Sequence, residues 1–252
     1  GHVGLYPRGL NIEAYKYIFQ DPRIMQGYRN SLMYAVGQTL ISLFITIPAA
    51  YALSRRDMTG RGLIMFYFVF TMYFTGGIIP FYVQVRRLGL INSGWSLVLP
   101  NAVNVFLLIV ARTFFAATIP KELLESAQLD GCNNTRFFIS IVLPLARAII
   151  AIVILFNVVQ NWNAFFHALL FINTAKKYPL QLVLRRLLIL NELLTGSVGM
   201  EFMSPEDILR RQFIADLLRY GIIVVAIAPL MMLYPFIQRH FVKGIMVGSI
   251  KG

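Results

Sequence analysis

The sequence predicts an all-α protein that crosses a membrane several times. Of its 252 residues, 58% are hydrophobic and 13% are charged, whereas an ordinary soluble domain has roughly 45–50% apolar and about 25% charged residues. Five long apolar runs contain few or no charges, and each could cross about 30 Å as a helix. The single cysteine, Cys132, excludes an internal disulfide framework.

The five apolar runs are the predicted membrane spans. In chain order they are Ser31–Ser54, Leu63–Val85, about Trp95–Phe115, about Leu145–Phe166 and about Phe213–Ile237. The first two end at paired arginines, Arg55-Arg56 and Arg86-Arg87, and basic residues are typical of the ends of spanning helices. Residues 1–30 hold no apolar span, and their abrupt start leads us to expect a sixth span upstream of this numbering. The intervening hydrophilic segments are too short for a second globular domain, so residues 1–252 are expected to form one membrane domain.

A short helix is expected between the third and fourth spans. Pro120 suits the first turn of a helix, where a missing N–H matters least, and Lys121–Leu129 consists mostly of good helix formers. Gly131 tolerates a backbone conformation that other residues resist, so the chain can turn there into a second helix from about Asn134. The pattern predicts a helix–turn–helix elbow outside the lipid.

The elbow carries polar groups and leads into a span. Glu125 and Asp130 are expected to project from it, and Pro144 fits the entry to the fourth span. Glycine and proline are common in any loop between spans, which is the simpler alternative.

The spacing within this segment resembles the EAA loop of ABC importer permeases, whose pattern is E-A-A, three residues, G, nine residues, and I-x-L-P. The matching residues are Glu125, Ala127, Gly131, Ile141, Leu143 and Pro144. Ser126 stands where alanine is usual, a change between small residues. The resemblance implies that the elbow docks into a groove on an ATP-hydrolysing subunit and transmits force. The residues that it assigns to this coupling are Glu125, Ser126, Ala127, Asp130, Gly131, Leu143 and Pro144.

The same resemblance implies the fold and the partners. It implies the type I importer permease fold, with five core spans and often an extra N-terminal one. The implied partners are a second homologous permease, two ATP-binding subunits and an external solute-binding protein, in the inner membrane of a bacterium. The chain has no G-x-x-x-x-G-K-[ST] loop, so ATP and Mg are expected on the partner subunits, with no catalysis in this chain.

The C-terminal run from Gln238 to Gly252 resembles the tail of maltose-type carbohydrate-importer permeases. That resemblance implies contact with the ATPase pair through the tail residues Lys243, Gly244, Lys251 and Gly252. Taken alone, a short tail with three glycines is more often a frayed end.

Residues 73–80 and 88–92 are similar to a branch of the family associated with complex, often uronate-rich oligosaccharides such as those of alginate. Import of acidic oligosaccharides is therefore expected, and neutral oligosaccharides of the maltose type are the alternative. A proton-coupled carrier is disfavoured, because the first four spans contain no Asp or Glu and the fifth contains only Asp216.

The charges do not fix the orientation. A cytoplasmic elbow (116–143) places residues 1–30, 86–94 and 167–212 outside and the tail 238–252 inside. Ten Lys and Arg then lie inside and thirteen outside, against the positive-inside rule, which is least reliable for long loops. The net charge of +12 is spread over at least six loops and ends, which argues against a nucleic-acid partner.

The external basic excess has three possible partners. An acidic sugar, an acidic binding protein and lipid phosphates would each be attracted to it. His2, His167, His240 and Cys132 lie far apart in the sequence without metal-ligand spacing, so no metal site is expected.

Polar residues within apolar spans are candidates for the translocation path, because lipid exposure would be costly for them. They are Asn101, Asn104, Asn157, Gln160, Asn161, Trp162, Asn163 and His167. Amides beside aromatic rings suit a sugar, whose hydroxyls accept and donate hydrogen bonds while its C–H face packs on a ring. The alternative is that these amides join helices to one another, as in any membrane bundle.

Overall fold

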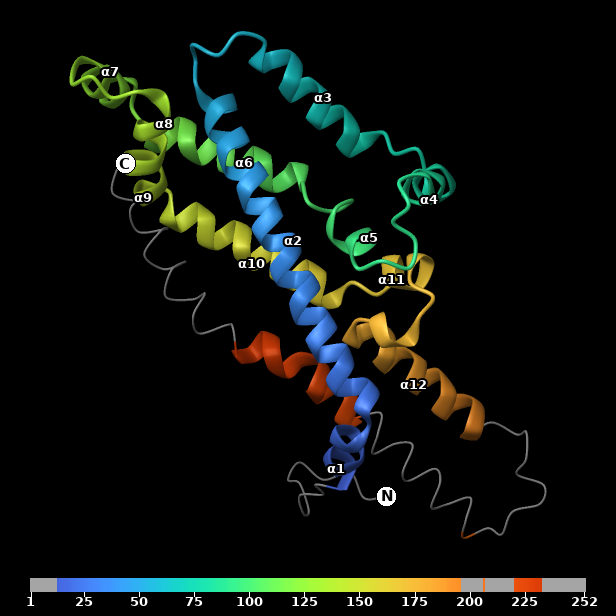
Figure 1. Ribbon diagram of the computed structural model, residues 1–252. Coiled ribbons are helices and arrows are strands. Elements are labelled where there is room, and N and C mark those ends of the chain that lie inside the picture. The colour runs from blue at the N-terminus through green and yellow to red at the C-terminus, as the bar shows by residue number, and fades with distance from the viewer. Residues whose placement is uncertain (1–12, 196–205, 207–219, 233–252) are drawn as a thin grey trace.

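The computed structural model describes residues 13–195, 206 and 220–232, and within these residues it contains helices and no strand (Figure 1). The helices are α1 (Glu13–Gln20), α2 (Pro22–Ser54), α3 (Arg61–Tyr73), α4 (Ile78–Arg87), α5 (Trp95–Val98), α6 (Val105–Thr118), α7 (Lys121–Leu129), α8 (Asn134–Phe137), the π-helix η1 (Phe138–Val142), α9 (Leu143–Leu145), α10 (Arg147–Asn163), α11 (Phe166–Phe171), the 3-10 helix η2 (Ala175–Lys177), α12 (Leu180–Thr195) and the helix Tyr220–Met232.

The longest described helix is α2, with 33 residues. It begins at Pro22, after the side chain of Asp21 accepts a hydrogen bond from the Arg23 N–H at 2.9 Å. By length and composition it is the one described helix that could cross a bilayer unaided, and the number rises to three if each of two bent helix pairs counts as one span. The first predicted span, Ser31–Ser54, lies within it.

Two apolar cores lie along α2, one toward each end. Toward its C-terminus, Ile47, Ala50, Tyr51 and Leu53 pack with buried side chains of α6, α7, α8 and α10. Toward its N-terminus, Ile24 packs with buried side chains of α12 and of the helix Tyr220–Met232. Figure 1 shows α2 running diagonally from the elements of one core to the elements of the other.

Close backbone approach joins α2 to the start of α12. A Cβ on Gly27 would lie 3.0 Å from the Leu180 Cα, so a side chain there would push the two backbones apart by a few tenths of an ångström. Nearby, Ser31 Oγ accepts a hydrogen bond from the Leu180 N–H at 2.8 Å, and Asn30 Nδ2 donates to the carbonyls of Lys176 and Tyr178. These contacts fix the 176–180 segment against α2.

The second predicted span, Leu63–Val85, is wrong as a continuous helix. The axes of α3 and α4 meet at 115°, with the break at residues 74–77. Gly77 adopts φ +83, which residues with a side chain rarely adopt. Pro80 then lacks the N–H that would continue the helix across the break.

The third predicted span is also interrupted, and the fourth is shorter than predicted. Within Trp95–Phe115, the chain leaves α5 near Pro100 and starts again at α6, where the Asn104 side chain caps the Leu107 N–H at 3.2 Å. The fourth predicted span, about Leu145–Phe166, contains the continuous helix α10, which begins just after a bend of 76° beside Ala146 and ends at Asn163. Of the fifth predicted span, Phe213–Ile237, the described part is the helix Tyr220–Met232.

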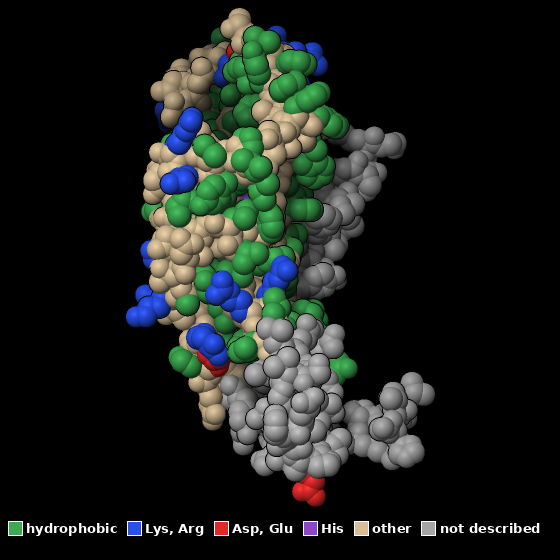
Figure 2. Space-filling model, turned by 90° about the vertical axis from the view of Figure 1, so that its right-hand side faces the viewer, with side chains coloured by type: hydrophobic (Ala, Val, Ile, Leu, Met, Phe, Trp, Pro, Cys, Tyr) green, Lys and Arg blue, Asp and Glu red, His purple; other side chains and the backbone are tan. Residues whose placement is uncertain are grey.

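The outer surface of the bundle is rich in apolar side chains. Phe44 on α2 is 85% exposed, and α3 has no buried residue. Figure 2 shows hydrophobic side chains over much of one face, with lysines and arginines among them. Such a surface is typical of a protein that faces lipid or further subunits.

Candidate functional site

The segment with the permease-like spacing begins in α7, and the bounds of α7 match the predicted helix. One side of α7 faces the bundle: Ala127 is buried, and Leu123 and Leu124 pack against the core around Tyr51. Glu125 and Ser126 lie on the exposed side. The third position of the pattern is therefore small because it packs against the bundle, whereas Ser126 replaces alanine without affecting the core.

The turn after α7 is a Schellman motif, in which the last carbonyls of a helix are satisfied by N–H groups that follow it. The Gly131 N–H donates to the Gln128 carbonyl at 3.0 Å, and the Cys132 N–H donates to the Ala127 carbonyl at 2.9 Å. Gly131 has φ +75, and no atom lies within 4 Å of a Cβ placed there. The backbone angle, rather than lack of space, therefore requires glycine.

The second helix of the elbow begins at Asn134, as predicted. Its N-cap is Asn133, whose side chain accepts a hydrogen bond from the Arg136 N–H at 2.8 Å. Phe137 is fully buried against α2. Farther along, Leu143 packs against the same core and Pro144 is exposed in the first turn of α9.

The outer side of the elbow offers one large apolar side chain among polar ones. Leu129, the last residue of α7, is 89% exposed, and its neighbours Gln128 and Asp130 are exposed too. Glu125 forms an ion pair with Lys121 at 2.7 Å, in which both side chains are mostly exposed. This side of α7 therefore presents one large apolar side chain surrounded by exposed polar ones.

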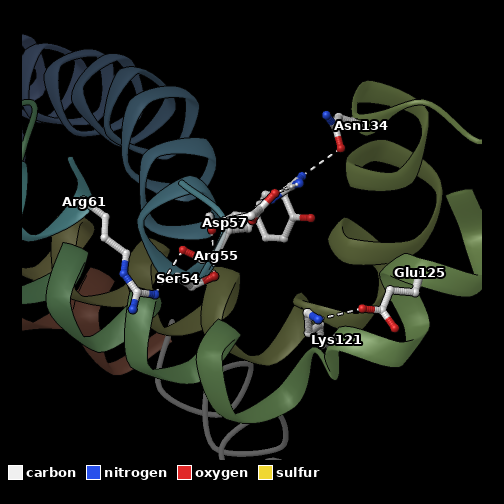
Figure 3. Close-up of polar contacts among 8 residues, drawn as sticks. Ser54, Arg55, Asp57, Arg61, Lys121, Glu125 and Asn134 are labelled. Atoms are coloured by element: carbon white, nitrogen blue, oxygen red, sulfur yellow. Dashed lines mark hydrogen bonds and ion pairs between the residues drawn. The ribbon is translucent and has the colours of Figure 1, made fainter. Parts of the chain in front are cut away.

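A polar cluster beside the elbow fixes the C-terminal end of α2 (Figure 3). Arg55 donates from Nε to Asp57 Oδ1 at 2.9 Å, and its Nη2 donates to Asp57 Oδ2. The hydrogen bonds from Arg55 hold the pKa of the Asp57 carboxyl below its usual value, so Asp57 is ionised at neutral pH. Arg61 Nη1 donates to the Arg55 carbonyl at 3.1 Å, and Arg112 Nε donates to the Leu53 carbonyl at 3.1 Å.

The predicted path residues fall into two groups. The first is a buried network between α2 and α10, in which Gln38 Nε2 donates to Asn157 Oδ1 at 3.1 Å and Asn161 Nδ2 donates to Gln38 Oε1. Asn157 Nδ2 donates to Ser42 Oγ at 3.1 Å. Gln38, Ser42 and Asn157 are almost fully buried, so this group joins the helices, as the alternative interpretation expects.

The network continues to α11 through Asn101. The Asn101 carbonyl accepts from Gln38 Nε2 at 2.5 Å, and Asn101 Nδ2 lies 3.0 Å from His167 Nδ1. A small cavity of about 20 Å³ lies beside Asn101, Asn161 and His167, with room for a water molecule.

The second group is more accessible. Asn104 Nδ2 donates to Gln160 Oε1 at 3.3 Å in an exposed pair between α6 and α10. Asn163 is exposed, and its Nδ2 donates within its own helix, to the Val159 carbonyl. Trp162 is buried instead, and its Nε1 donates to the Ala226 carbonyl at 2.8 Å.

Residues of these sites that were not predicted from the sequence include Gln38, Ser42, Arg55, Asp57 and Leu129. Gln38 and Ser42 lie one turn apart within an apolar run, the same signal that selected Asn157 and Asn161. The predicted tail residues Lys243, Gly244, Lys251 and Gly252 lie outside the described residues. Among the described residues, no three His, Cys, Asp or Glu side chains are grouped as a metal site would require.

Comparison with curated proteins and with solved structures finds relatives of this chain. No protein-family model matches the chain. It is 40% identical over 250 residues to Protein LplC of Bacillus subtilis (strain 168), covering 98% of this chain and 81% of that protein. It is 41% identical over 249 residues to the polygalacturonan/rhamnogalacturonan transport system permease protein YtcP of the same bacterium, covering 98% and 84%.

A solved structure is similar over almost the whole chain. It is a bacterial ABC transporter involved in the import of the acidic polysaccharide alginate, and the match has a TM-score of 0.82 and 28% sequence identity. The match covers 96% of this chain and 83% of that one. The regular structure of the described part is helical, and the chain is 40–41% identical to the two curated relatives over almost its whole length. The chain therefore belongs to the permease family of sugar ABC transporters.

Proposed function

We propose that the chain is the membrane permease subunit of an ATP-driven importer of acidic oligosaccharides in the inner membrane of a bacterium. The observation that carries the coupling role is the elbow, which is packed on one side and exposes Leu129 and Glu125 on the other. In this proposal that exposed side docks on an ATP-hydrolysing subunit, on the cytoplasmic side of the membrane. A second permease, a second ATPase subunit and an external solute-binding protein complete the assembly, and ATP and Mg are held by the ATPase subunits.

The proposed path follows the accessible polar group rather than the buried network. Asn104, Gln160 and Asn163 offer amides that a sugar hydroxyl can reach. Asn157 has its amide fully engaged between α2 and α10, so its proposed role is to hold the helices together while access alternates.

Two independent observations favour an acidic sugar. Polygalacturonan and alginate, the substances in the names of two similar proteins, are both chains of uronic acids. Lys176, Lys177, Arg185 and Arg186 are exposed on η2 and α12, and α12 lies at the end of the bundle away from α7 (Figure 1). A basic surface there would raise the local concentration of an anionic sugar or attract an acidic binding protein.

A competition assay with the reconstituted complex and its binding protein tests the substrate. We expect uronate oligosaccharides to stimulate ATP hydrolysis and neutral gluco-oligosaccharides of equal length to leave it at the basal rate. Stimulation by the neutral sugars alone would return the substrate to the maltose type.

Charge-removing variants separate the sugar from lipid phosphates as the partner of the basic residues. Lys176→Gln with Arg185→Gln should weaken stimulation by uronates, and the effect should shrink at high salt. If the effect depends only on the fraction of anionic lipid in the vesicles, the basic residues contact lipid instead.

A further inference from the structure

The elbow and α2 are in contact without being neighbours in the chain. The chain enters the elbow from α6 and leaves it into α10, whereas Arg55, at the end of α2, lies 79 positions before Asn134. Any movement of the elbow must therefore reach α2 through non-covalent contacts. This matters because α2 packs on α6, α10 and α12 and carries the buried Gln38 and Ser42.

Aromatic packing makes one of these contacts. The Tyr51 ring lies 5.3 Å from the Phe138 ring and 6.5 Å from the Phe137 ring, centroid to centroid, and it meets Phe115 edge to face at 5.8 Å. Such packing resists compression, but it offers little directional resistance to sliding or separation.

Arg55 makes the second contact, and it is directional. Its Nη1 donates to Asn134 Oδ1 at 2.8 Å, and Figure 3 shows this side chain extending from the end of α2 toward the first residue of α8. Asp57 accepts from the other two nitrogens, Nε and Nη2, and so orients the planar guanidinium with Nη1 toward Asn134. The Arg55 side chain is only 16% exposed, whereas its two acceptors lie at the surface, with the Asp57 side chain 59% exposed.

We propose that Arg55, oriented by Asp57, is a positioning residue that binds the elbow to α2, so that movement of the elbow in the ATPase cycle carries α2 with it. The proposal rests on the coupling role proposed above for the elbow. A lysine could keep the charge of Arg55 but not the two-pronged bond to Asp57 together with the third bond to Asn134.

The test uses the complete complex in liposomes, with the binding protein present. The measured quantity is the number of sugar molecules imported per ATP hydrolysed, because a variant that merely assembles less well lowers both rates together. We expect Arg55→Lys and Asn134→Leu each to lower this ratio roughly threefold, which is the size expected for losing a solvent-exposed hydrogen bond to a charged group. The double variant should be no worse than either single one, since both remove the same contact.

Two matched variants serve as controls. Asn134→Asp keeps an oxygen acceptor opposite the guanidinium and should retain coupling, and Arg56→Lys changes the exposed arginine next in the chain. If Arg55→Lys fails to assemble, Asn134→Leu decides the question, because it leaves the Arg55–Asp57 pair intact.

A ratio that is unchanged in Asn134→Leu would overturn the proposal. The Gly131→Pro variant, measured beside these, separates the two ideas. If that variant abolishes transport while Asn134→Leu does not change the ratio, the elbow couples without Arg55. If Gly131→Pro has no effect either, the coupling role of the elbow itself is wrong.

Discussion

At the scale of single residues, Gly131 has the most stringent requirement in the elbow. Its φ of +75 costs about 1–2 kcal/mol for an ordinary L-residue, and its N–H bonds to the Gln128 carbonyl. We expect substrate-stimulated ATPase activity to fall least in Gly131→Asn, more in Gly131→Ala and most in Gly131→Pro. Asparagine tolerates this conformation best, while proline can neither adopt it nor donate the hydrogen bond. Equal activity of the Asn and Pro variants would show that the turn conformation is not needed.

Leu129 tests the docking surface. Burying an exposed leucine stabilises a contact by about 1.5–3 kcal/mol, so Leu129→Asp should weaken binding of the ATPase subunit by about tenfold or more. Titration of purified ATPase subunit onto the permease pair in nanodiscs measures this affinity. Ser126→Ala is the control: the Ser126 hydroxyl bonds within its own helix, to the Leu123 carbonyl, so its loss should change little. Wild-type affinity in Leu129→Asp would place the docking surface elsewhere.

At the scale of elements, the buried polar contact between α2 and α10 should contribute to stability. Asn157→Leu removes the partner of both Gln38 and Ser42 in the interior, which should destabilise the protein by about 1–3 kcal/mol. Thermal unfolding in detergent measures the change, with the exposed Asn163→Leu as a control that should be nearly neutral. If the two variants unfold at the same temperature, the network contributes nothing to the bundle.

The elements differ in how much of them the sequence predicts. Local rules were enough for the bounds of α7 and the start of α8, because Pro120 suits the first turn of a helix and Gly131 permits the turn between the two helices. The breaks beside Gly77 and Pro100 were not predicted, since a search for apolar runs reads through glycine and proline in a membrane segment. The bend beside Ala146 lies at the predicted entry to the fourth span, next to Pro144. Among the candidate sites, the exposed side of α7 could be predicted from the spacing of the permease-like segment. The Arg55–Asn134 contact did not, because it depends on how α2 packs against the elbow.

At the scale of the whole molecule, the proposal requires partners. The purified chain alone, reconstituted in liposomes with ATP, should import no sugar. Uptake should appear only when the second permease, the ATPase subunits and the binding protein are all present. ATP-dependent uptake by the chain alone would contradict the proposed assembly.

The most direct test of the central claim, that import is coupled to ATP hydrolysis through the elbow, is sugar uptake by the reconstituted complex carrying Gly131→Pro. Circular dichroism and gel filtration should show folded helices and an assembled complex, because the substitution lies in an exposed turn outside the core. We predict that uptake and substrate-stimulated ATP hydrolysis are abolished while basal hydrolysis remains. Uptake and stimulation equal to those of the unmodified complex would contradict the claim.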